Sequence, residues 1–195
     1  MILSKEDLKA YIIADSKNYH ACIVPKRLYG FLKYINYNLR WLNPISDQKA
    51  IWDYIKTMRK TEYYINTGSF LRRIYYLHRL RKLARITGFQ IPPNVISEGL
   101  TIWHWGTIII NPNARIGKNL MLQPQVVIGW NEKTEEAPVI GDNVTIYGGS
   151  FIYGGVHVGN NVVIACNSFV NKDIPNNCMV AGNPATIIKY LEVNE

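Results

Sequence analysis

The sequence lacks several features that define large classes of proteins. It contains 3 cysteines with no Cys-x-x-Cys spacing, which predicts neither a disulfide framework nor a zinc site, so we expect Cys22, Cys166 and Cys178 to be reduced. A run of about 18 apolar residues, as a membrane-spanning helix needs, is absent. The opening MILSKEDLKAYII also lacks the basic-then-apolar order of a signal peptide, and this predicts a cytoplasmic protein.

Acidic residues are scarce in the first half of the chain. Residues 1–90 contain 17 Lys and Arg against 6 Asp and Glu, whereas residues 91–195 contain 5 against 8, so the halves carry net charges of +11 and −3. A basic half attracts anionic lipid, nucleic acid or polyanionic carbohydrate, although a solvated helical surface has the same composition. We expect no nucleic-acid partner, and a peripheral contact with an anionic membrane through the basic helices.

Apolar residues recur at spacings of three and four over the first half, which predicts an α-helical N-terminal domain over residues 1–88. Ser4 and Asp7 have the spacing of a capping box, and Gly88 is a typical helix stop. The expected helices cover residues 4–18, 25–43, 46–66 and 69–86.

The last of these helices is predicted to be amphipathic. Its apolar side should hold Tyr76, Leu77, Leu80, Leu83 and Ala84. Its opposite side is basic, with Arg72, His78, Arg79, Arg81, Lys82 and Arg85. Such a face suits anionic lipid or a phosphate-bearing acceptor, and it is also what a solvated helix presents.

A six-residue period dominates the second half of the chain. An aliphatic residue returns at Ile110, Ile116, Leu122, Ile128, Ile140, Ile146, Ile152, Val158, Ile164 and Val170. Neither a helix nor an alternating strand has this period, but short strands joined by tight corners do. The corners are rich in Gly and Asn, as in IGKN, IGDN and VGNN, which suits a positive φ. The pattern predicts an all-β solenoid over residues 89–195.

The period is broken in two places. Residues 129–139 are polar and acidic, which predicts a loop projecting from a corner, where substrates or partners commonly bind. After Val170 the repeat ends, and Pro175 and Pro184 fit a terminal strand followed by a cap over the end of the solenoid.

His104 stands out because counting back six residues from Ile110 places an imidazole where later rungs have an aliphatic side chain. Either the coil bulges there and turns His104 outward, or the ring is partly buried in the core register. A hydrogen-bonded core histidine with no function is the alternative.

From about residue 89 to 190 these motifs resemble the hexapeptide-repeat acyltransferases. GLTIWHWGTIIINPNARIG followed by MLQPQVVIG is similar to their short, serine acetyltransferase-like branch, often associated with polysaccharide synthesis. The resemblance implies a left-handed parallel β-helix of about five coils, a homotrimer with active sites between subunits, acetyl-CoA as co-substrate and no metal. It also implies direct transfer without an acyl-enzyme.

In that setting, His104 is the candidate base that takes the proton of an acceptor hydroxyl. Gln123 is expected beside it as a hydrogen-bonding partner or as a solvated amide, and Glu98 is the carboxylate expected to orient the ring. Trp103 and Trp105 flank the base and would stack on a sugar ring or pack against the helices.

The resemblance also implies where acetyl-CoA would lie. Related enzymes hold the pantetheine arm along a groove between neighbouring β-helices, where side chains need only be small. The candidate positions here are Gly129, Gly148, Gly149, Ala165 and Cys166. Lys172 and Lys189 are candidates for the phosphates of CoA, as point charges.

The acceptor is predicted from the differences between this chain and serine acetyltransferases. The place of their catalytic histidine falls within residues 122–124, which contain none; an aspartate of theirs aligns with Ile109, and a second histidine aligns with Ala137. A sugar hydroxyl on a polysaccharide precursor is therefore the first expectation. L-serine is the second, and a non-enzymatic trimeric scaffold is the third.

Overall fold

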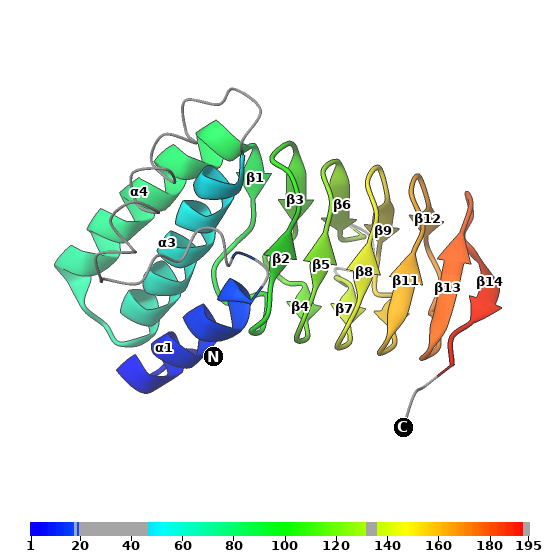
Figure 1. Cartoon of the computed structure of the whole chain (residues 1–195), viewed down its shortest axis with the longest axis horizontal. Helices are drawn as coiled ribbons and strands as arrows, with labels where there is room; N and C mark the ends of the chain where they lie inside the picture. The colour runs from blue at the N-terminus through cyan, green and yellow to red at the C-terminus, as the bar shows by residue number, and fades with distance from the viewer. Residues whose placement is uncertain (18, 20–46, 132–135, 193–195) are drawn as a thin grey trace, which may run out of the picture.

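The structure, a computed structural model, describes residues 1–17, 19, 47–131 and 136–192, with helices at the N-terminal end and short strands after them (Figure 1). The helices are α1 (Lys5–Ser16), α3 (Gln48–Asn66) and α4 (Phe70–Thr87). The strands are β1 (Phe89–Gln90), β2 (Thr101–Ile102), β3 (Ile108–Ile110), β4 (Arg115–Ile116), β5 (Met121–Leu122), β6 (Val126–Gly129), β7 (Val139–Ile140), β8 (Thr145–Ile146), β9 (Phe151–Tyr153), β10 (His157–Val158), β11 (Val162–Ile164), β12 (Phe169–Val170), β13 (Cys178–Ala181) and β14 (Thr186–Tyr190). The helix expected over residues 25–43 lies outside the described residues.

The start of α1 and the end of α4 follow the expected capping chemistry. At the start of α1, Ser4 Oγ accepts a bond from Asp7 N at 3.0 Å, and Asp7 Oδ2 accepts one from Ser4 N at 2.9 Å. Helix α4 ends at Gly88 with φ +81°, where a Cβ would lie 3.0 Å from the Gly106 backbone. Gly88 therefore both stops the helix and lets the chain turn closely into β1.

Over the described residues the strands form three sheets, ordered β1-β3-β6-β9-β12, β10-β7-β4 and β14-β13-β11-β8-β5-β2. From β3 to β12, each strand pairs in parallel with the strand three later, so three strands complete one coil. Ile108 pairs with Val126, a step of 18 residues, as three six-residue units require. The handedness of the coil stays a prediction.

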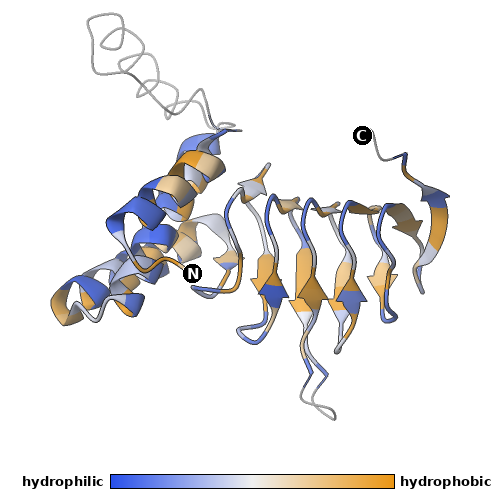
Figure 2. Ribbon diagram, turned by 90° about the horizontal axis from the view of Figure 1, so that it is seen from below, coloured by the Kyte–Doolittle hydropathy of each residue, from blue (hydrophilic) through white to orange (hydrophobic). Residues whose placement is uncertain are grey.

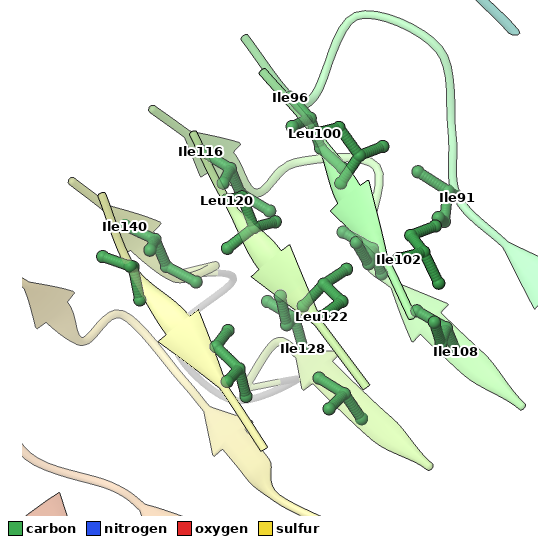
Figure 3. Close-up of a cluster of buried hydrophobic side chains, with 14 of the residues drawn as sticks. Ile91, Ile96, Leu100, Ile102, Ile108, Ile116, Leu120, Leu122, Ile128 and Ile140 are labelled. Carbon is green, nitrogen blue, oxygen red and sulfur yellow. The ribbon is translucent and has the colours of Figure 1, made fainter. Parts of the chain in front are cut away.

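The core is the stack of inward side chains expected from the period. Leu122, Ile146 and Ile164 are fully buried and paired in one sheet, and Ile128 and Ile152 are fully buried and paired in another. Figure 3 shows Leu122 and Ile128 among the side chains that fill the core. Figure 2 shows apolar residues recurring on the strands from one coil to the next. Each fully buried aliphatic side chain stabilises the fold by about 1.5–3 kcal/mol, so the repeat itself accounts for the stability of this half.

Asparagines form a ladder at one corner of the coils. Asn119, Asn143, Asn161 and Asn177 all have φ between 55° and 57°. Their side-chain amides bond in sequence from Asn119 to Asn143, to Asn161 and to Asn177, at 2.8–2.9 Å. The corner thus uses asparagine both for its positive φ and for its side-chain donor.

The two interruptions of the period have structural counterparts. Asn131 and Glu136 pair across the base of the expected loop, with Asn131 N 3.1 Å from Glu136 O, and residues 132–135 lie outside the described residues. After Val170, β13 continues its sheet in parallel and β14 adds to it antiparallel as the edge strand. The end of the chain therefore covers the edge of β13.

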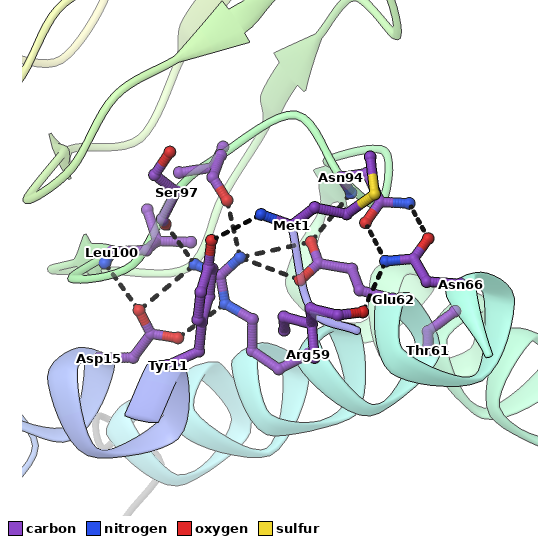
Figure 4. Close-up of polar contacts among 12 residues, drawn as sticks. Met1, Tyr11, Asp15, Arg59, Thr61, Glu62, Asn66, Asn94, Ser97 and Leu100 are labelled. Carbon is purple, nitrogen blue, oxygen red and sulfur yellow. Dashed lines mark hydrogen bonds and ion pairs between the residues drawn. The ribbon is translucent and has the colours of Figure 1, made fainter. Parts of the chain in front are cut away.

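A buried cation joins the helices to the first coil (Figure 4). Arg59 is completely buried, and its guanidinium bonds Asp15 Oδ2 at 2.8 Å, Glu62 Oε2 at 3.1 Å and Ser97 O at 2.6 Å. Burial opposes its charge, but Glu62 and Asp15 hold the Arg59 pKa above its usual value. Asp15 also accepts from Gly99 N and Leu100 N at 2.8 and 2.9 Å. This network fixes α1 and α3 against the coil.

Among the helices that the structure describes, none has the length and apolar character needed to cross a bilayer.

Candidate active site

The corner that holds His104 is two residues longer than those that follow it. Ile102 pairs with Leu122, a step of 20 residues, whereas Ile108 pairs with Val126, a step of 18. The extra residues lie between β2 and β3, in residues 103–107, which we call the His104 corner. Ile102 takes the inward position and is 1% exposed, while the His104 side chain is 68% exposed. The prediction of a core register for His104 was wrong, and the bulged, outward alternative is the observed one.

The exposed imidazole is held by a buried carboxylate. Asp47 Oδ2 lies 3.0 Å from His104 Nδ1 and 3.1 Å from Trp105 N, and Asp47 is only 6% exposed. A carboxylate only accepts, so Nδ1 carries the proton and donates it. Nε2 is then left with its lone pair, on a ring that faces outward. This is the arrangement required of a general base.

Asp47 lies at the start of α3, and its contact with His104 leaves the helix without a side-chain cap. It occupies the N-cap of the helix, where aspartate normally bonds the first backbone N–H groups. Within the described residues its side chain makes no such bond, and the first turn contains no acidic residue. The carboxylate that would cap α3 bonds His104 and Trp105 instead. A helix without its cap beside an exposed histidine is the pattern expected at a functional site.

Packing on both sides of the corner holds this geometry. Tyr19 Oη bonds Ile102 O at 2.8 Å and accepts from Ile102 N at 2.6 Å, directly before the corner. The Tyr19 ring stacks on Trp52 of α3, with centroids 5.4 Å apart. Further along α3, Arg59 donates to the backbone carbonyls of Ile96 and Ser97 in the first coil. The start of α3 and the end of β2 are therefore fixed to each other.

The corners equivalent to the His104 corner lie in a column along the solenoid: residues 123–125, 147–149 and 165–167. Gly149 N bonds Pro124 O at 3.2 Å, and Asn167 N bonds Gly148 O at 3.0 Å. Four of the predicted cofactor positions, Gly148, Gly149, Ala165 and Cys166, belong to this column. Gly149 has φ +75°, and a Cβ there would collide with the side chain of Asn167. The column thus has small residues because the corners are tight, and Gly148, Gly149 and Ala165 are half-buried while Cys166 is exposed.

Gln123 lies in this column but does not serve His104 in the structure. Its Oε1 accepts from Gly148 N at 3.3 Å, so the side chain runs toward the next coil. The two indoles are exposed beside the base, Trp103 at 45% and Trp105 at 42%. Stacking on a sugar ring and packing against the helices, the two expectations for these rings, both stay predictions.

Glu98 is not the carboxylate on His104, which corrects the sequence prediction. It lies between Ile96 and Leu100, at a different corner, where its Oε1 is 3.0 Å from Lys118 Nζ. Partial burial raises its pKa, but the hydrogen bond and charge of Lys118, together with further hydrogen bonds to the carboxylate, outweigh this and the pKa lies below its usual value. Glu98 was chosen because it is six residues before His104; the bulge after Ile102 invalidates that count.

The remaining predicted cofactor residues lie elsewhere. Gly129 ends β6 and pairs with Tyr153 of β9, at the end of β6 away from the column. Lys172 is exposed in the turn after β12, and Lys189 is exposed on the edge strand β14. The structure therefore does not bring Gly129, Lys172 and Lys189 to the column of Gly148 and Cys166.

Asp47 was missed by the sequence analysis. It is 57 residues from His104, and the chain offers no spacing that joins them. The one available signal was its place at a helix start, which has an ordinary structural explanation. Among the described residues, no group of three or more His, Cys, Asp and Glu side chains is arranged to hold a metal ion.

Comparisons with known proteins agree with the fold. The family described as bacterial transferase hexapeptide (six repeats) matches residues 137–172. The serine acetyltransferase of Helicobacter pylori is 33% identical over 122 residues, which cover 60% of this chain and 71% of that protein. The one from Staphylococcus epidermidis RP62A is 35% identical over 122 residues, and the match spans only 57% of its length.

Solved serine acetyltransferases have the same fold at lower identity. Soybean serine acetyltransferase complexed with serine covers 94% of this chain and 70% of its own, with 22% identity and a TM-score of 0.70. The Brucella abortus S19 enzyme in complex with coenzyme A covers 97% of this chain and 69% of its own, with 23% identity and a TM-score of 0.64.

Proposed function

The chain belongs to the hexapeptide-repeat acyltransferase family, and on that premise we propose that it transfers an acetyl group from acetyl-CoA to a hydroxyl group of an acceptor. The observation that carries the proposal is the pair of His104 and Asp47. An outward imidazole with a free Nε2, held by a buried carboxylate at 3.0 Å, is suited to deprotonating a hydroxyl.

The proposed reaction needs one proton relay. Nε2 of His104 takes the hydroxyl proton as the acceptor oxygen attacks the thioester carbonyl, and Asp47 stabilises the imidazolium that forms. A backbone N–H of the corner stabilises the oxyanion of the tetrahedral intermediate. The intermediate then expels the thiolate of CoA, which takes the proton back from Nε2. Acetyl passes directly to the acceptor, and His104 is regenerated.

Acetyl-CoA is proposed to lie along the column of corners that follows the His104 corner. Gly148, Gly149, Ala165 and Cys166 are small and half-buried or exposed, which leaves room beside them for an extended pantetheine arm. A related enzyme of Brucella abortus has been solved with coenzyme A, which supports this co-substrate. Gly129, Lys172 and Lys189 lie away from the column. They would contact only parts of CoA other than the pantetheine arm.

L-serine is the acceptor that the relatives favour. The matched curated proteins are serine acetyltransferases, and one solved relative is complexed with serine. This reverses the order in which the sequence placed a sugar hydroxyl before L-serine. The matches span little more than half of the length of several relatives, so we propose the acceptor and do not assign it from them.

A sugar hydroxyl is the second candidate, and one observation favours it. Trp103 and Trp105 are both exposed next to His104, where their faces are free to stack on a sugar ring. Ile109 and Ala137 stand where serine acetyltransferases have an aspartate and a histidine, which weakens recognition of a charged amino acid.

The wider organisation is proposed from the family. We expect a homotrimer of left-handed β-helices with about five coils each, active sites between subunits, and a cytoplasmic location. The helices end at Thr87 and the strands begin at Phe89, which supports a division into an N-terminal domain over residues 1–88 and an acyltransferase domain over 89–195.

An acceptor screen tests the function. The purified chain is incubated with acetyl-CoA and either L-serine, nucleotide sugars or oligosaccharides; CoA release is followed with a thiol reagent and the product by mass spectrometry. Acetylation of L-serine supports the first candidate, and acetylation of a sugar alone supports the second. If calorimetry detects no binding of acetyl-CoA at high concentration, the chain is a non-enzymatic scaffold and the proposal fails.

A further inference from the structure

Helix α4 is exposed along most of its length, in contrast to α3. Only Leu80 and Thr87 are buried, whereas nine residues of α3 are. Figure 1 shows α4 beside α3 on the side away from the strands. Leu77, expected on the inner side, is 37% exposed. α4 therefore has a long outward face that the described part of the chain does not cover.

The N-terminal half of this face is apolar. Phe70, Leu71, Ile74 and Tyr75 are between 50% and 78% exposed. Their spacing of one, four and five residues places them on one side of the helix. Large apolar side chains grouped on a surface in this way mark an interaction site more often than singly exposed ones do.

The C-terminal half of the same face is basic. Arg81 and Arg85 follow Phe70 and Ile74 by eleven residues, which is close to three turns, so they lie on the same side of the helix. Arg72, Arg73, Arg79 and Lys82 are also exposed, and α4 contains no Asp or Glu. The helix thus carries six cationic side chains and no anionic one, next to an apolar patch.

We infer that the exposed face of α4, residues 70–86, is a docking surface for an anionic lipid membrane. Arg and Lys of such a helix pair with acidic headgroups, while the apolar side chains enter the boundary between headgroups and acyl chains. The helix lies in the plane of the surface and does not span it.

Other occupants fit the face less well. A second copy packed on α4 could bury Phe70, Leu71 and Ile74, but it would leave the arginines of this face without an anionic partner, because α4 contains no Asp or Glu. A nucleic acid would pair with the arginines but leave Phe70, Leu71 and Ile74 in water. An anionic membrane satisfies both the charge and the apolar area.

Vesicle cosedimentation of the full chain tests the inference. Vesicles of phosphatidylcholine are compared with vesicles that also contain phosphatidylglycerol, at low and at physiological salt. We expect binding to the anionic vesicles alone, weakened by salt because surface charges are screened beyond about 8 Å at 0.15 M.

Two variants of α4 separate its two components. Arg81→Glu with Arg85→Glu reverses charge, and Leu71→Ser with Ile74→Ser removes apolar area; each should weaken vesicle binding at least about tenfold. Lys5→Glu with Lys9→Glu makes the same change of net charge on exposed residues of α1 and serves as the control. Circular dichroism checks that each variant is folded.

Three outcomes would overturn the inference. The first is no binding of the unaltered chain to anionic vesicles. The second is an equal loss of binding in the α1 control, which would make net charge alone responsible. The third is that Leu71→Ser with Ile74→Ser leaves vesicle binding intact but lowers the mass of the particle in light scattering, which would assign the face to a second copy.

Discussion

Asp47 decides which ring nitrogen of His104 is available for chemistry. Its carboxylate accepts from Nδ1 and from the Trp105 backbone, so both the tautomer and the orientation of the ring depend on one oxygen. A neutral amide at position 47 would turn its oxygen toward the same two donors, but it would no longer stabilise the imidazolium that forms when Nε2 takes a proton. His104 would then be a less effective base without any change in the fold of the corner.

Asp47→Asn should therefore lower kcat by roughly 100-fold or more while the KM for acetyl-CoA changes little. Steady-state rates of CoA release measure both constants. The control is Asp53→Asn, the same substitution six residues later on α3, where the carboxylate pairs with Lys49 and Lys56. Equal rates in both variants would show that Asp47 does not act on His104.

The ionisation of Asp7 makes the stability of α1 depend on pH. Backbone bonds from Leu3 and Ser4 favour its charged form and lower its pKa from 3.8. The stabilisation is therefore present above the unfolded pKa and is lost as the pH falls through the lowered folded value. The melting temperature of Asp7→Asn should lie below that of the unaltered chain at pH 7, and the difference should vanish in acid. A difference that persists unchanged at pH 2 would refute this.

Helix α3 joins the helices to the first coil through the guanidinium of Arg59, which is completely buried. Arg59 neutralises Asp15 and Glu62 and also bonds two backbone carbonyls of the first coil. Removing one member of a buried ion network leaves the other charges unpaired and buried. The free-energy penalty of these unpaired charges exceeds the net stabilisation that the ion pair gave. The site depends on this network because α3 presents Asp47.

Arg59→Met should reduce the free energy of unfolding by about 3–5 kcal/mol, measured by urea denaturation. Lys49→Met, which breaks only the half-exposed pair with Asp53, is the control and should cost about 1 kcal/mol or less. If both variants lose the same stability, the buried network has no special role.

The elements differ in how far the sequence predicts them. The coils follow from Ile110 onward because each six-residue unit contains its own inward positions and corner residues, which is local information. The two-residue bulge before β3 is not local, since it is defined only by the pairing of Ile102 with Leu122. The choice of Glu98 failed for that reason, and Asp47 was missed because its approach to His104 depends on how α3 packs.

At the scale of the whole molecule, the mildly acidic solenoid and the basic helices have different surfaces. The solenoid holds the candidate site at one corner column, while α4, whose cations are exposed, lies on the side of α3 away from the strands (Figure 1). This arrangement allows the helices to meet a charged surface while the site stays accessible. The amphipathic pattern of α4 was predictable, but the exposure of Phe70, Leu71 and Ile74 was not, because it depends on what packs against the helix.

Assembly gives a prediction at this scale. Sedimentation equilibrium should give a mass three times the 22.4 kDa of one chain, and activity per chain should fall on dilution as subunits separate. A particle with the mass of one chain that retains full activity would contradict active sites shared between subunits.

The most direct test of the central claim is the turnover of His104→Ala with acetyl-CoA and the acceptor found in the screen. If His104 is the base, kcat should fall by about 10²- to 10⁴-fold while acetyl-CoA still binds and the thermal melting curve is unchanged, because the side chain is exposed and supports no packing. Turnover equal to that of the unaltered chain would contradict the assignment of His104 and, with it, the proposed site.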